Sequence, residues 1–226
     1  HRLLLEQGVV PDVIMPGATV TNYQVIFSPY TPAFDDATLK RLENFVEQGG
    51  TWVLGPLSGC RTMEATAHRR AGYGLDFENW LGIHLRHRLP PGGVTKLATS
   101  QGIVGCRWWC DAYQTKPAQT VLVKYAGGPL DGFAAVVECP VAKGRVILLG
   151  TQPDDPWLRR LIQKLVPSPG VTADAGVLAV ERVTAAGKPA GSIVVNTRST
   201  AKSFRLPDGT SHQINGYGVI LNRNGW

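Results

Sequence analysis

The stretch QVIFSPYTPAFDDATLKRLENFVEQGGTWVL, residues 24–54, predicts a strand, a helix and a second strand in immediate succession. Gln24–Phe27 is an apolar run that ends at Ser28-Pro29, as expected of a parallel strand covered on both faces. Thr51–Leu54 begins the second strand directly after the helix. Two strands joined by a helix in this way imply a parallel sheet with right-handed crossovers, so the predicted fold class is α/β.

The helix between these strands has recognisable signals at both ends. Asp35 and Asp36 can cap its first turn, where backbone N–H groups lack partners and the helix dipole favours negative charge. Gly49-Gly50 ends it with the left-handed conformation that glycine adopts readily. Between them, apolar residues recur at helical spacing: Leu39, Leu42 and Val46.

The same alternation extends upstream, and the pattern changes downstream. Arg2–Gly8 is typical of a helix end, and Asp12–Met15 predicts a short strand. After the turn cluster Pro90–Gly93, strands are predicted to follow one another, the strongest being Val121–Tyr125, Phe133–Cys139 and Arg145–Gly150, before a helix at Pro156–Val166. We expect residues 1–167 to form a three-layer sandwich of the flavodoxin-like or class I glutamine-amidotransferase-like type.

A domain boundary is predicted at Pro167–Gly170, where prolines and glycine end the helix and stiffen a linker. Residues 168–226 carry strand patterns only. They lie at Val177–Val183, Ser192–Asn196, Lys202–Leu206 and Gly218–Asn222, separated by Gly, Pro and Asn turns. This second domain is therefore predicted to be a small all-β antiparallel sandwich.

The composition is that of a globular protein, with 43% hydrophobic and 18% charged residues. The net charge of +6 comes from scattered basic residues, and the densest cluster, His84–Arg88, fits a solvated basic face better than a nucleic-acid surface. No apolar run approaches the roughly 18 residues of a membrane span. The chain starts at His1, so we expect a longer natural polypeptide. The four cysteines leave the compartment open, with the cytoplasm favoured.

The turn Gly55–Cys60 is the candidate position for a catalytic nucleophile, because it contains Ser58 and Cys60 and follows the Thr51–Leu54 strand. The spacing does not fit G-x-S-x-G, and Pro56 suits a strained elbow poorly. A Cys60 nucleophile would also need a His base, and in amidotransferases that His follows a late strand. The corresponding segment, Gly150–Asp155, contains no His, and His68 lies in the wrong part of the chain. No catalytic residue is therefore assigned.

Metal and cofactor sites are not predicted either. His84 and His87 are three apart on an expected strand and would face opposite sides. If Cys106–Asp111 is one strand, Cys106 and Cys110 share a face but lie too far apart for an easy disulfide, and no second ligand pair exists for zinc. Buried free thiols are expected. The Gly49-Gly50 and Gly127-Gly128 pairs lack the surrounding motif of a phosphate site.

Trp108-Trp109 is the most informative aromatic pair. Strand alternation predicts that one tryptophan packs in the core while the other points outward. The outward ring would be an anchor for a protein interface, a platform for sugar stacking, or a partly covered surface residue.

A series of short motifs occurs in a fixed order along the chain. They are Ser28-Pro29, Asp35-Asp36, Val46–Thr51, Ser58-Gly59, Leu81–Ile83, Asp131–Val137 and Lys143–Thr151. In this order they resemble the trimerisation domain of the family-42 glycoside hydrolases, the β-galactosidases. The C-terminal segments Gly176–Arg182, Ile193–Asn196, Leu206–Gly209 and Tyr217–Leu221 resemble the small β domain of the same family. Cys60–Glu64 departs from the acidic loop of many relatives, and the family's first strand would lie before His1.

The resemblance implies that this chain is non-catalytic and that its partner is itself, in a homotrimer. Retaining glycosidases need two carboxylates about 5 Å apart, and these would belong to an N-terminal catalytic barrel that hydrolyses terminal β-galactosides. No catalytic, cofactor or metal residue carries over, and Trp108 and Trp109 are the candidate interface residues. Two alternatives stay open: an amidotransferase-like domain using Cys60, and a free-standing carbohydrate-binding or interaction protein.

Overall fold

The computed structural model describes residues 1–66, 77–90, 95–167 and 171–222. Contacts divide the chain into two compact units, one formed by Met15–Trp157 and the other by His1–Ile14 together with Leu158–Trp226. The N-terminal segment thus groups with the C-terminal strands. The division into domains 1–167 and 168–226 stays a prediction.

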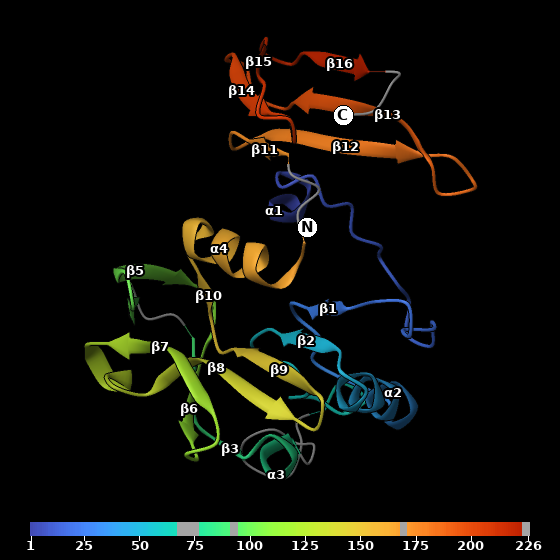
Figure 1. The fold of residues 1–226 in the computed structure, drawn as a ribbon. Helices are drawn as coiled ribbons and strands as arrows, with labels where there is room; N and C mark the ends of the chain where they lie inside the picture. Colours follow the sequence, from blue (N-terminus) through green and yellow to red (C-terminus); the bar gives the residue numbers. More distant parts are fainter. Residues whose placement is uncertain (67–76, 91–94, 168–170, 223–226) are drawn as a thin grey trace. The chain divides into compact units, whose positions relative to one another are not determined.

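The larger unit is built on one mixed sheet (Figure 1). Three strands are parallel: β1 (Val25–Ser28), β2 (Thr51–Leu54) and β9 (Gly144–Leu149). Antiparallel strands continue from β9 in the order β8 (Ala134–Val141), β7 (Thr120–Ala126), β4 (Thr95–Thr99), β5 (Gly102–Arg107) and β10 (Gln152–Pro153). A side branch pairs β6 (Cys110–Thr115) with β8 and with β3 (Ile83–Leu89).

This sheet curls back on itself. Strand β10 follows β9 after only Gly150 and Thr151, yet it pairs with β5 at the other end of the strand order. The first half of the unit therefore has the predicted β-α-β arrangement and the second half is antiparallel. The α/β class is confirmed in this coarse form, as a mixed curled sheet with few helices.

Helix α2 (Asp36–Glu47) forms as its sequence predicts. The Asp35 carboxylate accepts a 2.8 Å hydrogen bond from the Thr38 backbone N–H, which caps the first turn. Leu42, Phe45 and Val46 are buried along one face. Gly49 has φ 115° where the helix ends, a conformation that favours glycine.

An aromatic cluster fills the core beside α3 (Phe77–Leu81). The indole ring of Trp52 on β2 is fully buried, and its centroid lies 5.6 Å from that of Phe34 and 5.7 Å from that of Phe77, both in edge-on geometry. Trp80 lies 6.5 Å from the same ring. The Trp52 N–H donates to Ser28 Oγ, so its polar group is satisfied inside the core.

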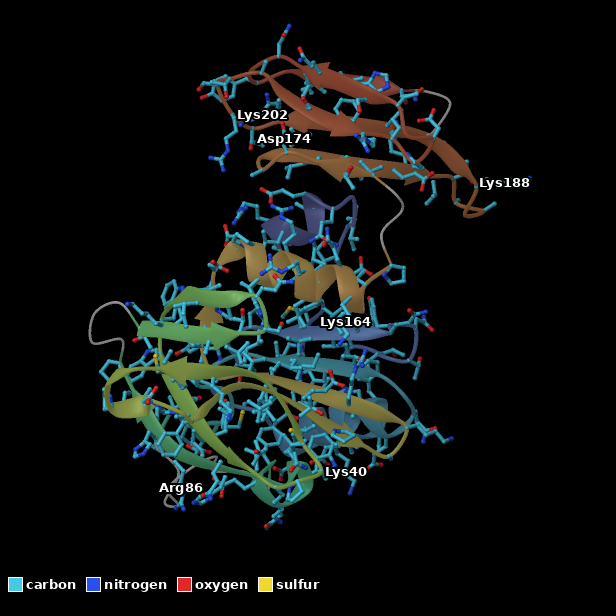
Figure 2. All side chains as sticks on the ribbon, turned by 60° about the vertical axis from the view of Figure 1, so that its left-hand side comes forward. Lys40, Arg86, Lys164, Asp174, Lys188 and Lys202 are labelled. Atoms are coloured by element: carbon cyan, nitrogen blue, oxygen red, sulfur yellow. The ribbon has the colours of Figure 1, made fainter. Side chains whose placement is uncertain are left out.

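The smaller unit contains two three-stranded antiparallel sheets, consistent with the predicted β-sandwich (Figure 1). One sheet has β12 (Val177–Val183), β13 (Pro189–Asn196) and β16 (Val219–Asn222), and the other has β11 (Thr172–Ala173), β14 (Lys202–Arg205) and β15 (Ser211–Ile214). Their shared core includes Val177, Val194, Phe204 and Ile214. Lys188 and Lys202 lie at the β12–β13 turn and at the start of β14 (Figure 2).

A buried carboxylate attaches the N-terminal helix α1 (Arg2–Leu5) to this unit. Glu6 accepts hydrogen bonds from Arg2, from Arg159 on α4 (Asp155–Leu165) and from the Gly176 backbone N–H. Burial raises the pKa of Glu6, but the three hydrogen bonds outweigh it and hold that pKa below its usual value. Glu6 therefore stays charged inside the unit.

Two expectations differ from the structure. The predicted strand at Asp12–Met15 is wrong: the segment is irregular, and the side chains of Val13 and Met15 are 85% and 75% exposed. Its apolar residues have no sheet neighbour to pair with. The predicted strand Cys106–Asp111 is also wrong, because β5 ends at Arg107 and β6 begins at Cys110. None of the described helices is long and apolar enough to cross a membrane.

Gly150 gives a direct test of how the sheet closes. A Cβ added at Gly150 would lie 2.1 Å from the Asp111 carbonyl oxygen and 2.8 Å from that of Ala135. We expect Gly150→Ala to lower the free energy of unfolding by about 3 kcal/mol or more, because backbone on both sides must move. Gly105→Ala is the control, since a Cβ there meets nothing within 4 Å. Equal urea midpoints for the two variants would contradict this account.

Candidate assembly surface

Trp108 and Trp109 form the corner between β5 and β6. Trp108 has φ 71°, a left-handed conformation that is uncommon for a residue other than glycine. This corner breaks the strand alternation, and both side chains lie at the surface, with Trp108 64% and Trp109 37% exposed. The prediction that one of the two packs in the core is therefore wrong. Ile103 on β5, 60% exposed, is an apolar surface residue that the sequence analysis missed.

The corner stands beside a buried ion pair. The Asp111 carboxylate is fully buried, and Arg88 on β3 donates to both of its oxygens, Nε at 2.8 Å and Nη2 at 3.0 Å. The backbone N–H of Leu57 donates to the same carboxylate at 3.1 Å. Arg88 thus belongs to an internal ion pair and not to the solvated basic face predicted for residues 84–88.

Arg86 and His87 of that basic segment line an open cavity of about 630 Å³. Arg86 is exposed on β3 (Figure 2) and donates a 2.8 Å hydrogen bond to Gln114. The His87 ring lies edge-on against Phe133, with 4.9 Å between ring centroids. Lys124 lines the same cavity. The outward part of the predicted basic face is therefore present.

The cysteines do not all behave as buried thiols. All four are free, and Cys110 and Cys139 are buried, but Cys60 and Cys106 are only partly buried. Because the chain turns at Trp108, Cys106 and Cys110 lie on different strands, and the Cys110 Sγ atom lies 4.0 Å from Thr95 Oγ1. The prediction that they lie far apart on one strand is wrong.

The Gly55–Cys60 turn carries some strain. Leu57 has φ 59°, and the Ser58 hydroxyl is buried without a hydrogen-bond partner among the described residues. Two of the histidines have other partners: His84 pairs with Glu78 at 2.8 Å, and His87 packs on Phe133. His68 lies outside the described residues. Neither His84 nor His87 is thus assigned as a base for Cys60.

A metal site needs several ligand side chains that converge on one point. Across the described ranges, no group of three or more His, Cys, Asp or Glu side chains converges as a metal site would require. The outstanding features of the larger unit are thus an exposed aromatic corner and the buried ion pair beside it. The first is a feature of the surface and the second a feature of the core.

Solved proteins share this fold across nearly the whole chain. A β-galactosidase from Bacillus circulans sp. alkalophilus matches 98% of this chain and 36% of its own, with a TM-score of 0.82 and 24% identity. A β-galactosidase from the haloarchaeon Halorubrum lacusprofundi matches 99% and 35%, with a TM-score of 0.80 and 21% identity. The fold is therefore that of one part of larger glycoside hydrolases.

Sequence comparison identifies that part. The family model of the β-galactosidase trimerisation domain matches residues 1–172, so the chain belongs to this family. β-Galactosidase YesZ of Bacillus subtilis is 28% identical over 217 residues, which is 92% of this chain and 32% of that protein. β-Galactosidase LacZ of Heyndrickxia coagulans is 27% identical and is covered over 27% of its length. The chain spans about a third of these relatives.

The Arg88–Asp111 pair is open to a matched test. Arg88→Met keeps most of the side-chain length but leaves the Asp111 carboxylate buried without its cation. We expect a loss of about 3 kcal/mol in the free energy of unfolding, measured by urea denaturation. Arg86→Met, on the same strand, removes the same charge from an exposed position and should change stability by less than about 0.5 kcal/mol. Similar losses of stability in both variants would show that the buried Arg88–Asp111 pair contributes no more than an exposed charge.

Proposed function

We propose that this chain is the assembly part of a β-galactosidase, and that it holds copies of the parent polypeptide together as a homotrimer. Membership of the trimerisation-domain family over residues 1–172 carries this proposal. The relatives are β-galactosidases of which the chain covers about a third. Hydrolysis of terminal β-galactosides is then the work of an N-terminal barrel of the same polypeptide.

Within this proposal, the Trp108–Trp109 corner is part of the subunit contact. Tryptophan is enriched at the energetic centres of protein interfaces because it buries a large area with few rotatable bonds. Ile103, on the strand that leads into the corner, adds exposed apolar surface. A three-fold ring joins two different patches of each subunit, so the corner would pack against a different surface of the next copy.

We also propose a specific fold type for the larger unit. We assign β1, α2 and β2 as one β-α-β unit of a flavodoxin-like or amidotransferase-like sandwich. The parallel pairing of β9 with β2 supports this assignment, because it extends the same sheet in the same direction. The antiparallel strands from β8 onward would then be an elaboration of that core.

Trp108→Ala and Trp109→Ala test the interface in the protein expressed from its full reading frame. Removing an anchor at an interface centre costs about 2 kcal/mol of binding free energy, which raises the dissociation constant roughly thirtyfold. We expect sedimentation velocity to show a shift from trimer to monomer without a stable dimer.

The control for this experiment is Tyr217→Ala, which removes a 72% exposed aromatic ring from the smaller unit. This variant should stay trimeric, because the β-sandwich is not expected to self-associate. A parent protein that is monomeric at micromolar concentration before any mutation would refute the assembly proposal. Circular dichroism of each variant separates loss of assembly from loss of fold.

Catalysis is tested separately with the isolated residues 1–226. We expect no hydrolysis of nitrophenyl β-galactoside, because the proposal assigns both catalytic carboxylates to the barrel. The full-length protein, assayed in parallel, should hydrolyse the substrate. Activity that copurifies with residues 1–226 through successive columns would contradict the proposal.

A further inference from the structure

Two cysteines flank the Trp108–Trp109 corner and converge on one threonine. Cys106, near the end of β5, is the register partner of Thr95 on β4. Side chains of directly opposed residues lie on the same face of a sheet, with Cβ atoms about 4.5–5.5 Å apart. Cys110, the first residue of β6, has its Sγ atom 4.0 Å from Thr95 Oγ1. Thr95 therefore marks a single location that both thiols reach.

The left-handed turn at Trp108 produces this convergence. In an unbroken strand, residues four apart are separated by about 13 Å along the strand. Here Trp108 has φ 71°, and the Cys110 thiol turns back to lie 3.9 Å from the Trp108 carbonyl oxygen. The two cysteines are thus brought to the same threonine by the corner and do not follow one another along a strand.

The two thiols do not have the same acidity. The hydrogen bond from Cys106 lowers the pKa of Cys110 to about 6, despite the opposing effect of burial. The same hydrogen bond, together with burial, raises the pKa of Cys106. Cys139 is different, because burial raises its pKa to about 12. Since the thiolate is the nucleophilic form, these shifts favour reaction at Cys110 over reaction at Cys139.

We propose that Cys106 and Cys110 form a reversible disulfide when the protein meets a peroxide. The Cys110 thiolate attacks one peroxide oxygen, the O–O bond breaks, and Cys110 becomes a sulfenic acid while hydroxide leaves. The Cys106 thiol then attacks the Cys110 sulfur, and its proton leaves with the displaced hydroxyl as water. Both sulfurs are oxidised by one electron each, and one peroxide is reduced to one water and one hydroxide, which becomes a second water by taking up the proton that Cys110 released on ionising. A dithiol reductant reverses the step by thiol–disulfide exchange.

Access and position support this site. Cys110 is buried but its neighbour Cys106 is only partly buried, so hydrogen peroxide, a molecule about as small as water, would reach Cys110 from the Cys106 side. The bond would close a ring from Cys106 to Cys110 that contains both Trp108 and Trp109. Oxidation would then fix the conformation of the aromatic corner. Its effect on assembly rests on the proposed function, but formation of the bond does not.

The sequence provides a direct assay. Trypsin cleaves after Arg107, which lies between the two cysteines, and releases residues 97–107 and 108–124 as separate peptides when the thiols are reduced. After brief treatment of the full-length protein with hydrogen peroxide and alkylation of the remaining thiols, we expect these peptides to stay joined. Their combined mass should be lower by two hydrogen atoms, and reduction should separate them.

Cys139→Ser is the matched control and should leave the linkage unchanged, whereas Cys110→Ser should abolish it. The proposal is overturned if the two peptides separate without reduction, if Cys106 or Cys110 is driven to sulfinic acid without a bridge, or if Cys60 or Cys139 is linked instead. The wild-type result stands even if a variant fails to fold.

Sedimentation of the oxidised and reduced protein reports on assembly separately. An unchanged trimer together with a mapped bond would count against the proposed interface and not against the disulfide.

Discussion

The buried Asp111 carboxylate is the constraint on which the larger unit depends. A carboxylate out of water is costly unless cations and donors surround it, and here Arg88 and the Leu57 N–H supply them. The backbone of Asp111 is also hydrogen-bonded on both sides. Its N–H donates to the Gly150 carbonyl, and its own carbonyl accepts from the Tyr125 hydroxyl. One residue therefore joins the turn after β2, strand β3, strand β7 and the end of β9. These are segments that the chain order would otherwise leave apart.

Gly150 shows how closely these segments approach. Its N–H donates to Ala135 and its carbonyl accepts from Asp111, so strands on both sides contact it with no room for a side chain. From this point the chain enters β10, which pairs with β5 and completes the curl of the sheet. The aromatic corner lies between β5 and β6, two residues from Asp111. Its left-handed backbone is thus held by a junction that cannot easily relax, and a rigid corner loses little conformational entropy when it is covered by a partner.

Local signals in the sequence were enough to predict much of the fold. The Asp35 cap, the apolar spacing of α2 and the runs that become β1, β2 and β9 depend on neighbours within a few residues. The Trp108 corner could not be predicted in this way, because alternation assumes a continuous strand. The Arg88–Asp111 pair spans 23 residues, and the Glu6–Gly176 hydrogen bond spans 170. Charge patterns carry no information about partners so distant in sequence, so the basic cluster at residues 84–88 predicts a solvated Arg88, and nothing local indicates the Glu6–Gly176 contact.

The two buried carboxylates also bear on where catalysis takes place. A glycosidase's general acid needs a carboxyl whose pKa is raised, so that it carries a proton to the leaving group. Glu6 has the opposite environment, with two arginines and a backbone N–H holding its pKa low. Asp111 is bound differently, with Arg88 on both carboxylate oxygens and the Leu57 N–H as a backbone donor. Both side chains are thus committed to holding their own units together. Among the described residues, these two buried carboxylates hold segments of the fold together, while Trp108 and Trp109 lie at the surface. This arrangement agrees with the assembly role proposed above.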